Sequence, residues 1–68
     1  MIEKGQKVSV AGGVKTIICI VADVDTAKDI LWIRLPTGNM LRLNMNKKSG
    51  CYEGRIAGLD LYIDPSEN

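Results

Sequence analysis

Turn-forming residues divide this sequence at regular intervals. Glycine and proline, several of them beside serine or asparagine, occur at Gly5, Gly12-Gly13, residues 36–39, Ser49-Gly50, Gly54, Gly58 and Pro65. The segments between them are short, apolar and rich in Ile and Val, which favour strands. Short strands separated by turns at intervals of about 8–12 residues are typical of small barrels and sandwiches. The sequence therefore predicts an all-β fold.

The length limits this fold to one small domain. A chain of 68 residues buries only about 60% of the surface that it exposes when unfolded. Hydrophobic residues make up 46% of the sequence and Phe is absent, so we expect an aliphatic core. We predict a single domain over residues 1–64 and a frayed tail over residues 65–68.

Alternation of polar and apolar residues sets the expected strands. They cover residues 7–11, 14–22, 30–35, 40–45, 51–56 and 59–63, and we expect them to form an antiparallel barrel of five or six strands. The second strand is apolar at consecutive positions, a pattern typical of a strand covered on both faces. An acidic loop over residues 22–29, with at most a short helical turn, joins it to the third strand.

The hairpin of the third and fourth strands has a predictable register. Three apolar side chains share one face of each strand: Leu31, Ile33 and Leu35 on one, and Leu41, Leu43 and Met45 on the other. Both sets point inward if Leu35 pairs with Leu41 across a three-residue loop at residues 37–39. The same register pairs Ile33 with Leu43, and Leu31 with Met45.

The outer face of that hairpin carries the candidate functional side chains. The register places Trp32 opposite Asn44 and Arg34 opposite Arg42, and two opposed arginines repel each other unless an anion or a carboxylate lies between them. An exposed tryptophan beside two arginines indicates a binding surface. The predicted binding residues are Trp32, Arg34, Met40, Arg42, Asn44, Lys47, Lys48 and Arg55.

The charge is nearly balanced overall but unevenly distributed. The formal net charge is +1, basic residues dominate residues 34–55, and the segment after Arg55 contains only acidic charges. This distribution allows a purely structural interpretation as well. In that alternative, Trp32 packs beneath the N-terminus or the last strand, and the arginines pair with Asp60 or Asp64.

The sequence lacks the residues and spacings of the commoner catalytic and metal sites, and its carboxylates leave only hydrolysis by Asp and Glu open. The sequence contains no histidine, which removes the commonest general base and the commonest transition-metal ligand. Cys19 and Cys51 fit no zinc spacing and are too few for a disulfide scaffold. Residues 23–34 lack the ligands and the glycine of an EF-hand loop, and no phosphate-loop motif occurs. We expect a non-enzymatic protein without a cofactor or a metal site.

The sequence also predicts a cytoplasmic protein without a membrane partner. The longest apolar run, residues 17–22, is far shorter than the roughly 20 residues of a membrane-spanning helix. The first residues include charges and lack the apolar core of a signal peptide. Without an export signal, the two cysteines are expected to be reduced thiols.

Residues 4–38 resemble the KOW-type version of the Src-homology-3-like barrel. That family pattern is, loosely, Gly-x-x-Val-x-Val-x-x-Gly, an apolar strand, an acidic turn, and an apolar strand that ends at a glycine. Here the matching segments are Gly5-Gln6-Lys7-Val8-Ser9-Val10-Ala11-Gly12-Gly13, residues 14–21, Asp23-Val24-Asp25, and Leu31-Trp32-Ile33-Arg34-Leu35 with Gly38. Such domains occur in ribosomal proteins and transcription elongation factors, where they bind RNA or protein. The resemblance implies a barrel of this type and a binding function, without identifying the ligand.

A second, shorter resemblance does not extend to function. Lys47-Lys48-Ser49-Gly50 followed by Gly54-x-Ile56-x-Gly58 is similar to a segment of plasmid-encoded type II dihydrofolate reductases. In that family most of the barrel follows this segment, whereas only ten residues follow Gly58 here. The Val-Gln-Ile-Tyr run of that family's active site is missing, so we do not expect reductase activity.

Two functions therefore remain open. The first is a protein-interaction module (an adaptor, an inhibitor or an assembly component), because exposed Trp, Arg, Tyr and Met are typical of interface hot spots. The second is a module that binds RNA or single-stranded nucleic acid, with Trp32 stacked on a base and basic side chains on phosphates. The sequence pI of about 7.8 is low for nucleic-acid modules and favours the first. The barrel could also form a homodimer through Ile30, Trp32 and Met40.

Overall fold

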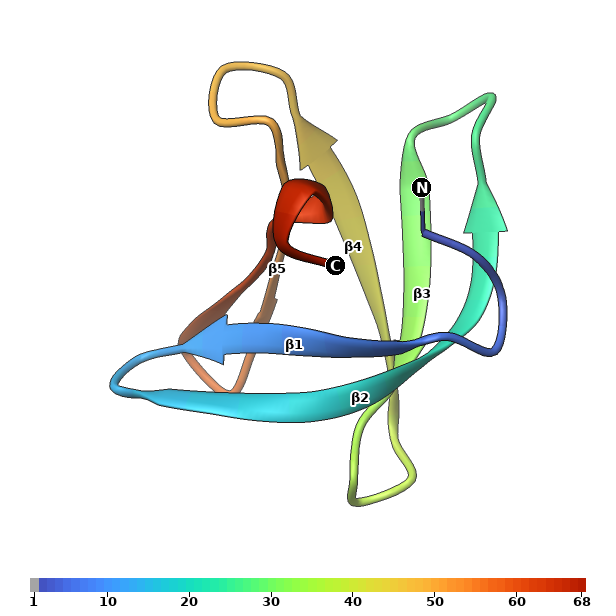
Figure 1. The fold of residues 1–68 in the computed structure, drawn as a ribbon. Coiled ribbons are helices and arrows are strands. Elements are labelled where there is room, and N and C mark those ends of the chain that lie inside the picture. Colours follow the sequence, from blue (N-terminus) through green and yellow to red (C-terminus); the bar gives the residue numbers. More distant parts are fainter. Residues whose placement is uncertain (1) are drawn as a thin grey trace.

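The computed structural model describes residues 2–68 as a closed barrel of six antiparallel strands (Figure 1). The strands are β1 (Lys7–Gly12), β2 (Lys15–Asp25), β3 (Ile30–Arg34), β4 (Met40–Asn46), β5 (Cys51–Ile56) and β6 (Leu59–Ile63). Each strand pairs with the next in chain order, and β6 returns to pair with β1. This confirms the predicted small all-β barrel and is consistent with the Src-homology-3-like type. Met1, which the sequence places in the domain, lies outside the described residues.

Alternate residues of the strands build one aliphatic core inside the barrel. The buried hydrophobic residues are Ile2, Val8, Val10, Cys19, Val21, Leu31, Ile33, Leu35, Leu43, Leu61 and Ile63. No charged or polar residue is buried among residues 2–68. Because the inward positions hold only apolar side chains, every charged group of the described strands faces outward or lies at a barrel end.

A β-bulge lets β2 continue further than the sequence predicts. The pairing with β3 shifts between Val21 and Asp23, so that Ala22 is the extra residue. Beyond the bulge, Val24 packs against the core and Asp23 is exposed. The first part of the expected acidic loop is therefore strand, and residues 26–29 form a turn instead of a helical turn.

The outer side of β2 is not covered, contrary to the expectation from its apolar sequence. Cys19 and Val21 are buried, but Ile18 and Ile20, which alternate with them, are 55% and 43% exposed. The prediction of a strand covered on both faces is wrong because a barrel of one sheet has no second layer to place over its outer surface.

The β3–β4 hairpin keeps the predicted faces but not the predicted register. Leu31 pairs with Leu43 and Ile33 pairs with Leu41, a shift of two residues from the expectation. A two-residue shift leaves both leucine sets inward, because the side-chain period of a strand is two. On the outer face it places Arg42 opposite Trp32 and moves it away from Arg34. The predicted direct opposition of the two arginines is therefore wrong.

The turn residues explain this register. The N–H of Leu35 donates to the carbonyl of Asn39 at 2.8 Å, so the loop is residues 36–38. Gly38 donates to the carbonyl of Leu35 at 2.8 Å and has a φ of 94°. A three-residue hairpin loop needs a positive φ at its third position, which glycine adopts most readily. With Gly38 at that position, Pro36 starts the turn, where its fixed φ fits.

The last residues bridge the place where β6 meets β1. The sequence predicts a frayed tail, whereas the structure has a short 3₁₀ helix, η1 (Pro65–Glu67), with Asp64 as its N-cap. The side-chain oxygen of Asn68 accepts from the backbone N–H of Ser9 at 2.8 Å. The backbone carbonyl of Asn68 accepts from the side-chain amide of Gln6 at 2.9 Å. The red segment of Figure 1 accordingly lies beside β1.

Candidate functional site

The part of the chain that the structure describes offers an open surface and no concave site. No pocket is present over residues 2–68. Within the same range, no three side chains of His, Cys, Asp or Glu gather where they could hold a metal ion. The side chains that could act together therefore lie on the outer side of the barrel wall.

Outward side chains of three adjacent strands form the most distinctive part of this surface. We call it the β2–β4 face and define it by Ile18, Ile20, Asp23, Trp32, Arg34, Met40 and Arg42. In its first row, Ile20, Arg34 and Met40 lie side by side across the strands. In its second row, Asp23, Trp32 and Arg42 do the same.

Exposed apolar side chains surround Arg34 on the β2–β4 face. Ile20, Trp32 and Met40 are 43%, 38% and 45% exposed, although large apolar side chains in a chain this short are needed for the core. Trp32 lies diagonally across from both Ile20 and Met40, at a separation of about 7–8 Å that an aromatic side chain can reach across. These three residues therefore lie around Arg34, and Ile18 follows Ile20 on the same side of β2, so the exposed apolar residues are grouped on one part of the surface with one arginine among them.

Opposite charges flank Trp32. Trp32 has the carboxylate of Asp23 on one side and the guanidinium of Arg42 on the other. Neither Arg34 nor Arg42 has a carboxylate within 4.0 Å among residues 2–68. Both guanidinium groups therefore remain available to an external acceptor.

The structure does not contain the purely structural arrangement in which Trp32 is packed away and the arginines pair with Asp60 or Asp64. The carboxylate of Asp60 pairs with Arg55 at 3.4 Å, and the carboxylate of Asp64 accepts from Ser66. Neither acid pairs with the arginines on β3 and β4. Trp32 lies on the outer face opposite Arg42, and not among the buried core residues.

The predicted binding residues fall into three groups. Trp32, Arg34, Met40, Arg42 and Asn44 share the outer face of β3 and β4. The other basic residues lie apart from them: Lys47 and Lys48 in the turn after β4, and Arg55 on β5 in its ion pair with Asp60. The structure thus brings together the hairpin residues and separates the two lysines from them.

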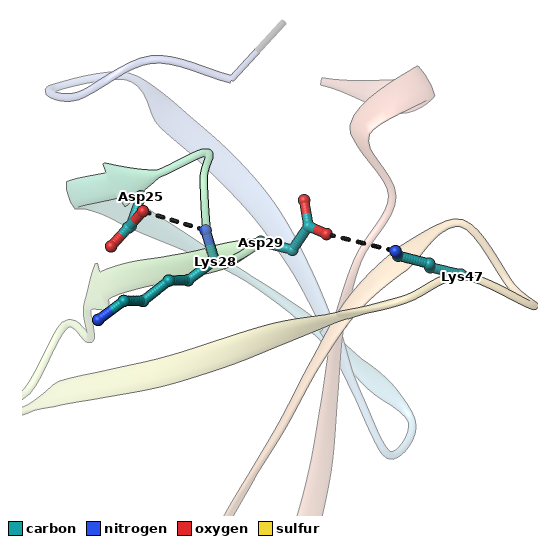
Figure 2. A network of polar contacts seen from close by, with 4 residues as sticks. All are labelled: Asp25, Lys28, Asp29 and Lys47. Atoms are coloured by element: carbon teal, nitrogen blue, oxygen red, sulfur yellow. Dashed lines mark hydrogen bonds and ion pairs between the residues drawn. The ribbon is translucent and has the colours of Figure 1, made fainter.

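The turn that contains Lys47 and Lys48 lies at the opposite end of β4 from Met40, next to the β2–β3 turn (Figure 2). Lys47 Nζ lies 4.0 Å from Asp29 Oδ2, and Asp25 Oδ1 accepts from the N–H of Lys28 at 3.1 Å. Both side chains of the ion pair are well exposed, so it contributes about 0–1 kcal/mol. These contacts join residues of the two turns and involve no residue of the β2–β4 face.

The two cysteines have different environments. Cys19 is buried in β2, and this burial raises the pKa of its thiol above the ordinary value of 9.0. Cys51, at the start of β5, is partly exposed and unpaired. Cys19 therefore packs as a small apolar residue, in agreement with its place in the most apolar strand.

Sequence reasoning missed the β2 part of the face. The sequence predicts Ile18 and Ile20 in a covered strand and Asp23 in a loop. In the structure Ile20 and Asp23 lie directly beside the predicted residues of β3. The signal was present in the run of apolar residues 17–21. A single small sheet has nothing to cover both sides of such a strand, so one set of its isoleucines had to be exposed.

Comparisons with protein families, with curated proteins and with solved structures found no significant match to this chain. Within residues 2–68, no helix has the length and apolar character that crossing a membrane requires.

Proposed function

We propose that this protein is a non-catalytic protein-interaction module that binds its partner through the β2–β4 face. The observation that carries the proposal is the exposure of four large apolar side chains on three adjacent strands: Ile18 and Ile20 on β2, Trp32 on β3 and Met40 on β4. Exposed apolar patches rimmed by polar residues mark interaction sites in soluble proteins. The aliphatic part of this patch has little use in a site for nucleic acid, which relies on aromatic and basic groups.

The composition of the face supports the same proposal. Protein interfaces are enriched in Trp, Met and Arg, and their hot spots are enriched in Trp and Arg. Trp32, Met40 and Arg42 supply these residue types at neighbouring positions. The charges on either side of Trp32 have opposite signs, and the formal net charge of the chain is +1. A partner with both charge signs fits this pattern better than a polyanion does.

The test is capture of a partner from the native host by the immobilised chain, with variants of the face. Trp32→Ala should weaken binding by about 30-fold or more, which corresponds to a hot spot of roughly 2 kcal/mol. Ile20→Ser should also weaken it. Leu59→Ser is the matched control, because Leu59 is an aliphatic residue with 44% exposure, close to the 43% of Ile20, on β6. Equal binding by all these variants would rule out the β2–β4 face.

One observation favours a second candidate, a module that binds RNA or single-stranded nucleic acid. Arg34 and Arg42 are exposed without carboxylate partners among residues 2–68, beside a tryptophan that could stack on a base. Titration with single-stranded RNA at two salt concentrations, followed by the fluorescence of Trp32, tests it. Salt-sensitive quenching that Arg34→Ala with Arg42→Ala abolishes, and that Ile20→Ser leaves intact, would support nucleic acid over protein.

A further inference from the structure

We infer that the partner of the β2–β4 face is a second copy of this chain, docked about a twofold axis that runs along β3. This inference rests on the proposed function, because it names the partner of the same face. It follows from the order of the charged and apolar residues across the three strands.

In both rows of the face, the residues on β2 and β4 are a pair that could contact each other favourably across an interface. In the second row, Trp32 is flanked by an acid on β2, Asp23, and a base on β4, Arg42. In the first row, Arg34 is flanked by one apolar residue on each side, Ile20 and Met40. The strands β2 and β4 each lie about 4.8 Å from β3, so the flanking residues are equally far from it.

A twofold axis along β3 exchanges the two flanks. It places β2 of one copy over β4 of the other, so that Asp23 meets Arg42 of the second copy, and the reverse pair forms as well. Ile20 likewise meets Met40 of the second copy, and the two Trp32 side chains meet on the axis. A single patch thus becomes complementary to itself, as an interface with twofold symmetry requires.

The charges also select the direction of the axis. A twofold axis across the strands, in the plane of the interface, keeps β2 over β2 and β4 over β4, so Asp23 cannot lie opposite Arg42. Where such an axis passes through the second row, each of these two residues meets its own copy. Like charges in register oppose association. Only the axis along β3 brings both opposite-charge pairs together. Arg34 lies on that axis and meets its own copy, and this single repulsive contact provides a specific test.

The available surface suits a weak dimer. The accessible surface of the chain is 4641 Å², and a standard interface covers about 800 Å² per partner, which is about a sixth of that total. The outer side of three of the six strands can supply this area. Because the barrel wall is convex, we expect the interface to be at the small end of the range and the dissociation constant to be micromolar.

Sedimentation equilibrium of the whole chain from micromolar to millimolar concentration tests the dimer, and charge exchange tests its geometry. Asp23→Arg alone and Arg42→Asp alone should each raise the dissociation constant about tenfold or more, because each variant opposes like charges twice. An equal mixture of these two variants should form a heterodimer, and the double variant should regain the homodimer. Lys15→Asp and Glu67→Arg are matched charge changes outside the face and should have no effect.

Arg34→Gln tests whether the twofold axis runs along β3, where Arg34 would meet its own copy. It removes the repulsion on the axis, so the dimer should be as tight as that of the wild type or tighter. A weaker dimer in Arg34→Gln, or no recovery in the mixed variants, would overturn the twofold arrangement. A chain that remains monomeric at millimolar concentration would overturn the inference itself. The proposed function would still be decided separately, by the capture experiment with Trp32→Ala and Ile20→Ser.

Discussion

Replacing Gly54 with alanine should destabilise the barrel strongly, even though the change adds one methyl group. Gly54 lies in β5 at an inward-facing position, where a side chain would point into the core. A Cβ atom built there would overlap the Cδ2 atom of Leu43 and lie 3.0 Å from the backbone oxygen of Arg42. The φ of Gly54 is not positive, so the cost arises from this close approach of β4 and β5 and not from backbone conformation.

The structure indicates the magnitude of the loss. Leu43 has 0% exposure, so its side chain can move only by displacing other core residues, and the backbone oxygen of Arg42 cannot rotate away. Overpacking of this kind costs about 1–3 kcal/mol, and we expect the upper half, about 2–3 kcal/mol. A domain of this length has a total stability of about 3–10 kcal/mol. The midpoint of thermal unfolding should therefore fall by about 10–20 °C.

Thermal and urea unfolding followed by circular dichroism measure this change. A second variant tests the cause: Leu43→Val shortens the side chain that the new methyl group meets. Gly54→Ala should cost clearly less in the Leu43→Val background than in the wild type, with a coupling of about 1 kcal/mol. A loss below about 0.5 kcal/mol for Gly54→Ala, or equal losses in the two backgrounds, would refute the reasoning.

Four further predictions concern one turn, the two thiols and the last residue. Ala57 has a φ of 51° in the turn that it forms with Gly58, so Ala57→Asn should raise the free energy of unfolding by about 0.5–1 kcal/mol in urea denaturation, because Asn-Gly suits this turn. A thiol reagent should label Cys51 quickly and Cys19 only at the rate of unfolding. Burial raises the pKa of the Cys19 thiol above 9.0 in the folded chain, so the stability that this thiol contributes is present below pH 9 and is lost as the pH rises further. Cys19→Ala should lack this part of the decline in stability when urea unfolding is compared at neutral and alkaline pH. Asn68→Ala should lower the free energy of unfolding by about 1 kcal/mol, since the N–H of Ser9 then loses its acceptor.

The fold class was predictable because its signals are local. The spacing of glycines and prolines marks the turns, and the alternation of residues such as Val8 and Val10 marks the inward face. The bounds of β5 and β6 agree with the prediction, because glycine and serine bound the first and the Ala57-Gly58 turn separates the two. These features depend on residues close in sequence, which is where a single sequence is most informative.

The register and the site were less predictable for physical reasons. Alternation determines which face a residue belongs to, but any two-residue slip preserves the faces, so Leu31 could pair with either Met45 or Leu43 on that evidence. The position of Gly38 in the loop decides between them. The bulge at Ala22 was not visible either, and it is the bulge that turns Asp23 outward beside Trp32. Three of the seven residues of the β2–β4 face therefore required the structure.

The chain-order arrangement of the strands has a consequence for the order in which the barrel assembles. Five of the six strand pairs join neighbours in sequence, and such hairpins form with short loops. The sixth joins Ala11 to Tyr62 and Gly12 to Leu61 only, and it must close a loop of about 50 residues, whose entropy cost is larger. We expect this seam to form last in folding and to open first. Amide hydrogen exchange should then be faster at the seam than at the centre of β3. The hydrogen bonds that Asn68 makes with Ser9 and Gln6 should slow this opening.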